Sequence, residues 1–81
     1  MATTIQLPAL RKELTEAGFT VLRSGQYRDE DPLATHVYRD HVTGGAEVVV
    51  GSTEGRRQAL AFLRGRHSAR RDPLGLGIRV S

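Results

Sequence analysis

The sequence has 81 residues, enough for one small domain with a thin apolar core. It has no cysteine, its three histidines lack the spacing of metal ligands, and no apolar run could span a membrane, so we expect no metal, no cofactor and no membrane partner. The net charge of +3 is uneven: residues 54–71 carry six arginines and one glutamate, whereas residues 1–53 carry five cations and seven acids.

The first predicted element is a helix over residues 8–17. Leucines recur at helical spacing up to Leu14, and Pro8 suits a first helical turn. Gly18 suits the left-handed residue that ends a helix. Phe19 then falls where a residue just past such a glycine packs back onto the last turn, so we expect contact between Phe19 and Leu14.

Three strands follow this helix. Residues 19–22, FTVL, have strand composition, and residues 24–34, SGQYRDEDPLA, are rich in turn formers and acids, which indicates a long loop. The segments THVYRDHV and AEVVVG then bracket Gly44 and Gly45, which is a hairpin signal. Residues 19–51 therefore predict one strand, a loop and a hairpin.

Two registers of this hairpin remain open. A two-residue loop at Gly44 and Gly45 pairs His41 with Val48, whereas a three-residue loop pairs His41 with Glu47. Each register buries one polar group. The pattern therefore leaves undecided which face of the sheet meets the helices.

The last predicted helix begins near residue 53 and ends at Gly65. Ser52 or Thr53 can cap its N-terminus. Its apolar side consists of Ala59, Leu60, Phe62 and Leu63. Beyond it, residues 67–81 are expected to be a basic tail with glycine and proline, in which Ile78–Val80 either form an edge strand or stay disordered.

The predicted fold is α+β, in the order α-β-β-β-α. We expect a three-stranded antiparallel sheet with both helices packed on one face. This single domain covers residues 1–66, and residues 67–81 form the tail.

Three segments, ELTEAGFTVLRSG, THVYRD and GGAEVVVGS, resemble the HicA-type mRNA interferase toxins, and the order of elements is also that of double-stranded RNA-binding domains. The resemblance implies a cytoplasmic toxin that cleaves RNA without a metal and is neutralised by an antitoxin protein. A strand histidine is the catalytic residue of that family, and His36 is the nearest match. Aligning on Tyr38 instead places Thr35 at that position, so either a bulge brings His36 into place or the activity is absent.

His36 is thus the candidate general base for RNA cleavage. In an unbroken strand it shares a face with Tyr38 and Asp40, whereas His41 points to the other face. Phosphate contacts would then come from Arg39 or from the arginines of the last helix. The alternative is an exposed polar face without catalytic activity.

Six arginines are the candidate nucleic-acid-binding residues: Arg56, Arg57, Arg64, Arg66, Arg70 and Arg71. Arginine suits phosphate because its planar fork binds two oxygens, and an excess of arginine is the electrostatic footprint of a phosphate-binding surface. GRRQA is also similar to the start of the second helix in double-stranded RNA-binding domains, which assigns phosphate contacts to Arg56 and Arg57. The alternative is a solvated helix and a frayed tail.

The sequence therefore predicts a small nucleic-acid-binding protein, HicA-like, with RNA favoured over DNA. One alternative is a noncatalytic regulator encoded by a phage, a plasmid or another mobile element. Another is an adaptor whose arginines bind an acidic protein. An antitoxin protein, or a second copy of the chain bound through the acidic loop, is the expected protein partner.

Overall fold

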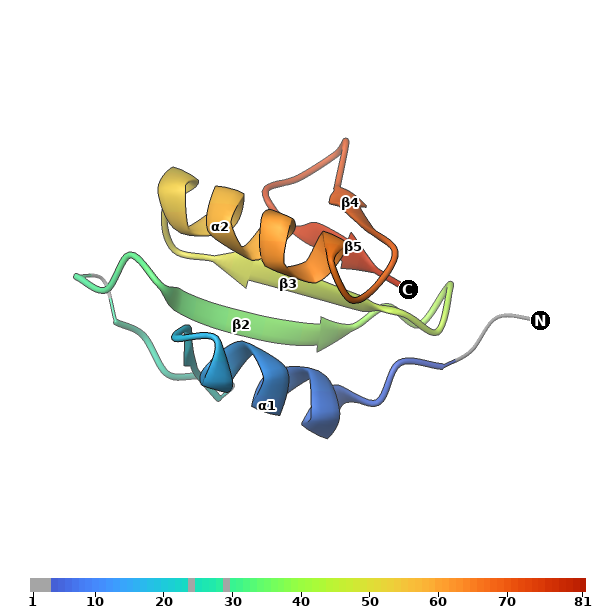
Figure 1. Cartoon of the computed structure of the whole chain (residues 1–81), viewed down its shortest axis with the longest axis horizontal. Coiled ribbons are helices and arrows are strands. Elements are labelled where there is room, and N and C mark those ends of the chain that lie inside the picture. Colours follow the sequence, from blue (N-terminus) through green and yellow to red (C-terminus); the bar gives the residue numbers. More distant parts are fainter. Residues whose placement is uncertain (1–3, 24, 29) are drawn as a thin grey trace.

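The computed structural model describes residues 4–23, 25–28 and 30–81, and within these residues it has two helices and one mixed five-stranded sheet (Figure 1). In chain order the elements are α1 (Leu7–Glu16), β1 (Thr20–Val21), β2 (Ala34–Arg39), β3 (Ala46–Val50), α2 (Thr53–Arg64), β4 (Ala69–Arg71) and β5 (Ile78–Val80). The strand order is β1-β2-β3-β5-β4. The α+β class is confirmed, whereas the three-stranded antiparallel sheet is wrong, because β1 is parallel to β2 and two further strands extend the sheet.

The end of α1 follows the predicted pattern. Gly18 has φ +102°, in the left-handed region. Its N–H donates to the Thr15 carbonyl at 3.1 Å, and the Phe19 N–H donates to the Leu14 carbonyl at 3.0 Å. These two bonds form the Schellman arrangement, and Phe19 and Leu14 lie in the same core cluster. The predicted glycine end of α1 is therefore confirmed, and Phe19 and Leu14 share the core as expected.

β1 runs in the same direction as β2 because of the long loop between them. The pairs are Thr20 with Ala34 and Val21 with Thr35. Residues 22–33 return the chain to the level at which β1 begins, whereas a tight turn would have reversed its direction. β1 is so short that, among the described residues, no strand pairs with residues 36–39 of β2 on the side away from β3. This stretch of β2 is a free edge.

The hairpin between β2 and β3 has neither of the two registers considered from the sequence. Val37 pairs with Val48, and Arg39 pairs with Ala46. The reason is a longer turn: the Asp40 carboxylate accepts the Val42 N–H at 3.0 Å, which keeps residues 41–44 outside the ladder.

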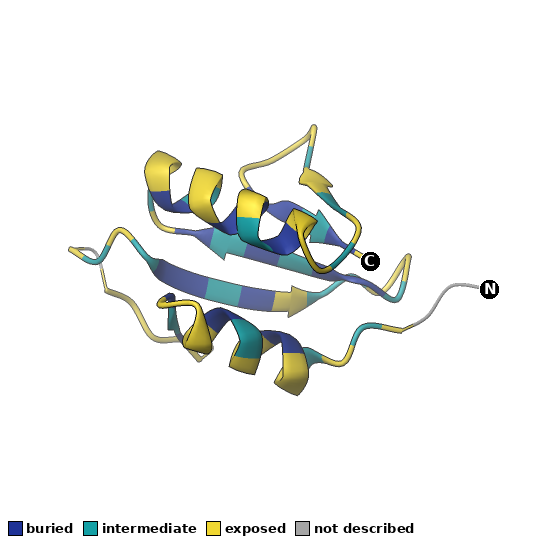
Figure 2. Cartoon of the chain, in the orientation of Figure 1, coloured by how far each residue is buried: buried dark blue, intermediate teal, exposed yellow. Residues whose placement is uncertain are grey.

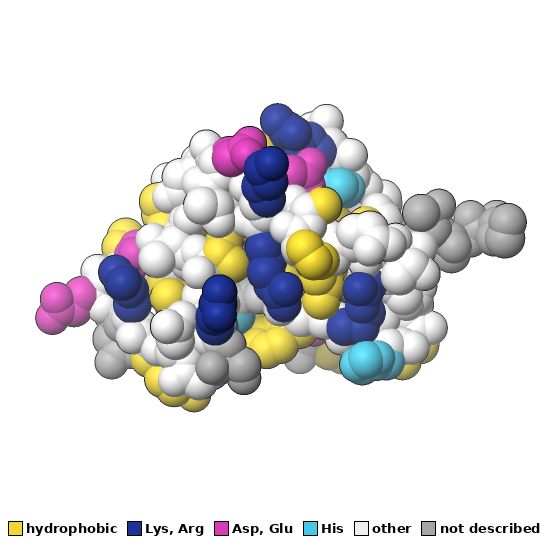
Figure 3. Space-filling model, turned by 90° about the horizontal axis from the view of Figure 1, so that it is seen from below, with side chains coloured by type: hydrophobic (Ala, Val, Ile, Leu, Met, Phe, Trp, Pro, Cys, Tyr) yellow, Lys and Arg dark blue, Asp and Glu magenta, His cyan; other side chains and the backbone are white. Residues whose placement is uncertain are grey.

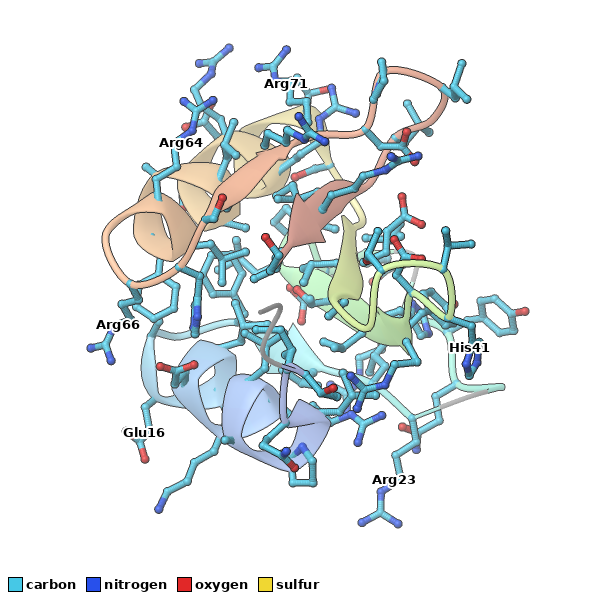
Figure 4. The ribbon with its side chains drawn as sticks, turned by 90° about the vertical axis from the view of Figure 1, so that its right-hand side faces the viewer. Glu16, Arg23, His41, Arg64, Arg66 and Arg71 are labelled. Atoms are coloured by element: carbon cyan, nitrogen blue, oxygen red, sulfur yellow. The ribbon has the colours of Figure 1, made fainter. Side chains whose placement is uncertain are left out.

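α2 begins and ends where the sequence predicted. The Ser52 hydroxyl accepts the Gly55 N–H at 2.9 Å, and Gly65 is the last, half-helical residue. Both helices lie on the same face of the sheet, to its left in Figure 4, so this part of the prediction is confirmed. Their buried sides face the strands (Figure 2). Within the described residues, neither helix is long and apolar enough to cross a bilayer.

Residues 69–80 belong to the domain, which corrects the predicted boundary at residue 66 and the tail over residues 67–81. β5 is an inner strand that pairs with β3 on one side and with β4 on the other. Ile78 and Val80 are 0% and 2% exposed and lie in the core with Val48. Their alternation with Arg79 is the period of a half-buried strand, which places both apolar side chains under α2.

Candidate nucleic-acid interface

Four of the six candidate arginines lie along the line where α2 packs on β4. We call this group the basic seam: Arg56, Arg57, Arg64 and Arg71. Arg57 and Arg64 are seven residues apart, so they share a flank of α2 and lie about 10 Å apart along its axis. Arg64 Nε donates to the Ala69 carbonyl at 3.4 Å, which holds this flank next to β4. Arg64 and Arg71 extend from the same edge of the molecule in Figure 4.

Arg56 and Arg71 meet at a hollow of about 310 Å³, whose floor is the β4–β5 loop. Arg56 Nη1 donates to the Leu76 carbonyl at 3.4 Å, a long bond. Arg56 Nε is buried and, in the part of the chain that the structure describes, has no hydrogen-bond partner. The Asp72 carboxylate also lines this hollow, but it is paired with Arg79. A buried donor without an acceptor is costly, so an anionic oxygen that reached Arg56 Nε would be stabilised there, with the Arg71 guanidinium in the same hollow.

The other two candidate arginines are not part of the seam. Arg66 is directed towards α1, where Nη1 lies 3.5 Å from Glu13 Oε1, and its guanidinium lies 5.1 Å from the centre of the Phe62 ring. Arg70 lies opposite Arg79 in the ladder, on the sheet face away from the helices. The six arginines therefore do not form one continuous surface.

On the sheet face away from the helices, acidic and basic side chains lie together near β3. Asp72 Oδ1 lies 3.3 Å from Arg79 Nη2. A hydrogen bond with Asp72, together with burial, raises the pKa of Glu47. The same hydrogen bond and the Leu74 N–H lower the pKa of Asp72. The two carboxyl groups lie together and Asp72 is paired with Arg79, so this area offers little net attraction for a polyanion.

His36 lies on this same open face, far along the sheet from the seam. The ladder between β2 and β3 pairs every residue from Thr35 to Arg39, so no bulge shifts His36. Thr35, where the alignment on Tyr38 places the family's histidine, is fully buried on the side of the helices. The bulge that the sequence comparison required is therefore not present in β2.

The groups predicted to assist His36 lie elsewhere. Arg39 Nη1 donates to the carbonyls of Ile5 (2.6 Å) and Gly44 (2.9 Å), and so holds the N-terminal segment on the hairpin. Hydrogen bonds from Thr43 and from the Val42 N–H lower the pKa of Asp40, which serves the turn rather than the imidazole. His41 lies in that turn, outside the ladder. Among these residues, only Tyr38 stays beside His36, with ring centres 6.0 Å apart.

Sequence reasoning missed the residues that surround His36. His36 Nε2 lies 3.0 Å from the Gln26 carbonyl oxygen, and the Tyr27 ring lies 6.3 Å from the imidazole. Arg11 and Arg23 line the same hollow as His36. Figure 3 views the molecule from below Figure 1, on the side of α1, and shows Lys and Arg side chains spread across it. The only local signal was the alternation of His36 and Tyr38, because the others come from a loop and from α1.

Comparison with family models, with curated proteins and with solved structures finds no match to this chain. The resemblance to HicA-type toxins is therefore carried by the sequence segments alone and stays a hypothesis.

Proposed function

We propose that this protein binds the phosphate backbone of a nucleic acid through the basic seam. The supporting observation is the charge balance along α2 and β4. Within the described residues, the only ion pair that involves a seam arginine is the one between Arg57 and Glu54 (3.1 Å), and it is exposed on both sides. Such a pair contributes little and is readily exchanged for a phosphate.

The seam fits backbone recognition rather than recognition of base sequence. Its reach of about 10 Å along α2 spans more than one phosphate, because each strand of a duplex carries one phosphate per ~3.4 Å of helix axis. RNA is favoured over DNA because of the resemblance to RNA-cleaving toxins, and we expect the protein to act in the cytoplasm. A noncatalytic regulator needs no more than these contacts.

The seam is tested by the salt dependence of binding. We expect the triple variant Arg57→Ala/Arg64→Ala/Arg71→Ala to bind a labelled RNA more weakly than the wild type. The slope of log affinity against log salt concentration is negative, and its magnitude should decrease by about 2 to 3, because each lost phosphate contact removes about 0.7 to 0.9 from it. Fluorescence anisotropy over a range of salt concentrations measures both quantities.

Lys12→Ala provides the matched control. It removes the same charge as Arg64→Ala, but from the exposed face of α1, outside the seam. If the two single variants lose affinity equally, net charge rather than the seam determines binding. Failure of the wild type to bind at low salt would refute the proposal and would leave the adaptor for an acidic protein as the better explanation.

A second candidate function is RNA cleavage with His36 as the general base, acting from its own position on β2 rather than from that of the HicA histidine, which Thr35 occupies. This would make the protein a metal-independent endoribonuclease and its partner an antitoxin. The observation that favours it is the contact with Gln26. A carbonyl oxygen can only accept, so His36 Nε2 carries the proton and Nδ1 of the neutral ring keeps its lone pair. That lone pair could take a proton from a 2′-hydroxyl.

Cleavage is tested with purified protein and RNA in the presence of EDTA. The expected result is fragmentation by the wild type and by His41→Ala, which removes an exposed histidine from the hairpin loop, and intact RNA with His36→Ala. Growth arrest on expression should follow the same pattern. Intact RNA with the wild type would end this candidate and leave the seam proposal standing.

A further inference from the structure

Three aromatic rings lie next to one another on the open face of the sheet, at its β1 end. We call Tyr27, His36 and Tyr38 the aromatic row. The rings of His36 and Tyr38 are stacked, with centres 6.0 Å apart and planes 14° apart. Tyr27 is 6.3 Å from His36 at 57°. His36 and Tyr38 alternate along β2, and the bond between His36 and the Gln26 carbonyl brings Tyr27 to them from the loop.

The two tyrosines expose large aromatic rings to solvent. Tyr27 is 81% exposed and Tyr38 is 50% exposed. Within the described residues, neither hydroxyl makes a hydrogen bond to the protein. Exposed rings of this kind present large flat apolar surfaces at a low cost in side-chain entropy. They are therefore suited to a flat ligand.

Cations flank the aromatic row on both sides. A hollow of about 220 Å³ on one side is lined by Tyr27, Arg28, His36 and Val49, among others. A hollow of about 650 Å³ on the other side is lined by Arg11, Arg23, His36 and Tyr38, among others.

These cations differ in whether an acidic side chain lies next to them. Arg28 lies near Asp31, a carboxylate whose pKa is lowered by hydrogen bonds from Thr20 and from the Leu33 N–H, and by the Arg28 charge. In the described part of the chain, the guanidinium groups of Arg11 and Arg23 have no carboxylate partner and no hydrogen bond. An anion attached to a flat ring would therefore find Arg23 and Arg11 available next to the stack.

We infer that the aromatic row binds an unpaired nucleobase, with the adjoining phosphates on Arg11 and Arg23; this inference rests on the proposed function and extends it to single-stranded nucleic acid. Every base has a π-face, so stacking tolerates any sequence, and a groove of arginines can follow the backbone. The smaller hollow has the scale of one planar base rather than of a folded partner. The exposed rings suit the base, and the nearby arginines suit its phosphates.

The chain carries a built-in reporter for this site. It has two tyrosines and no tryptophan, and both tyrosines belong to the aromatic row. Stacking of a base should quench tyrosine fluorescence, whereas a phosphate on the distant seam should leave it unchanged. We therefore propose titrating the protein with a ten-residue oligouridylate and with a ten-unit abasic oligomer, which has the same backbone without bases. Free N-acetyl-tyrosinamide corrects for absorption by the oligomers.

We expect the oligouridylate to quench the tyrosine emission and the abasic oligomer to bind without quenching. Tyr27→Ala and Tyr38→Ala should each weaken binding of the oligouridylate roughly tenfold, and should not change binding of the abasic oligomer. Tyr27→Phe and Tyr38→Phe keep the ring and should stay within about twofold of the wild type. Leu74→Ala, a change at a side chain that is 90% exposed in the β4–β5 loop, should change neither.

The remaining outcomes distinguish the base site on the aromatic row from phosphate binding by the basic seam. Binding of both oligomers without quenching, or alanine variants equal to the wild type, would overturn the base site and keep the seam. If neither oligomer binds, the seam proposal fails; quenching by uridine 5′-monophosphate would then still support the base site, and no quenching would overturn it as well. Equal quenching by decaglutamate would overturn the inference in favour of an acidic protein partner.

Discussion

Replacing Ile78 with alanine is expected to lower the free energy of unfolding by about 2 to 5 kcal/mol, which would leave much of the protein unfolded at 37 °C. Ile78 is fully buried, and its neighbours in the ladder are Val48 of β3 and Arg71 of β4. The loss combines the transfer energy of the removed carbons with the cavity that remains. A core of this size supplies only about 3 to 5 kcal/mol in total, so the domain cannot absorb such a loss.

Leu76→Ala is the matched control, because Leu76 is 71% exposed and lies two residues before Ile78. It should change the free energy of unfolding by less than about 0.5 kcal/mol. Urea denaturation followed by circular dichroism measures both variants. Equal small effects would mean that residues 67–81 are a tail after all and that the domain ends near residue 66.

The elements predicted well from the sequence are those whose signals are local. A proline at the start of α1, the glycine at its end and the cap at Ser52 act within a few residues of their positions, so no tertiary contact is needed to recognise them. The burial of Leu60 and Leu63 follows in the same way from the helical period.

The sheet was predicted poorly because its pairing depends on distant partners. Ile78–Val80 has a strand pattern of only three residues between glycines and the C-terminus, and only its pairing with β3 makes it an inner strand. The direction of β1 depends on where the loop returns the chain, and the hairpin register depends on the Asp40 turn. None of these could be read from residue types alone.

The same contrast between local signals and distant contacts holds for the candidate sites. The helical period placed Arg57 and Arg64 together, but the direction of Arg66 depends on Glu13 of α1 and that of Arg70 on the alternation within β4. The aromatic row joins a loop residue, Tyr27, to β2, and no spacing in the sequence indicates that contact.

Replacing Gly55 with alanine is expected to destabilise the domain by about 1 to 3 kcal/mol, although alanine favours a helix over glycine by about 1 kcal/mol. A Cβ at this position would lie 2.7 Å from Val50 Cγ1 and well inside van der Waals contact with the Pro32 carbonyl oxygen. That carbonyl accepts a hydrogen bond of 2.8 Å from the Ser52 hydroxyl, so the loop cannot move away without losing the bond. Urea denaturation again gives the change in unfolding free energy.

Gly65→Ala tests whether close approach, rather than the loss of a glycine, causes this effect. A Cβ at Gly65 has the Phe62 carbonyl oxygen 3.5 Å away as its nearest neighbour, and its backbone is already helical, with φ −75°. This variant should be neutral or slightly stabilising. Pro32 belongs to the loop that carries Tyr27, so Gly55→Ala should also weaken quenching by the oligouridylate at temperatures where the variant remains folded. Wild-type stability and quenching in Gly55→Ala would mean that the loop before β2 is not held against α2, and that the contact between His36 and the Gln26 carbonyl alone places Tyr27.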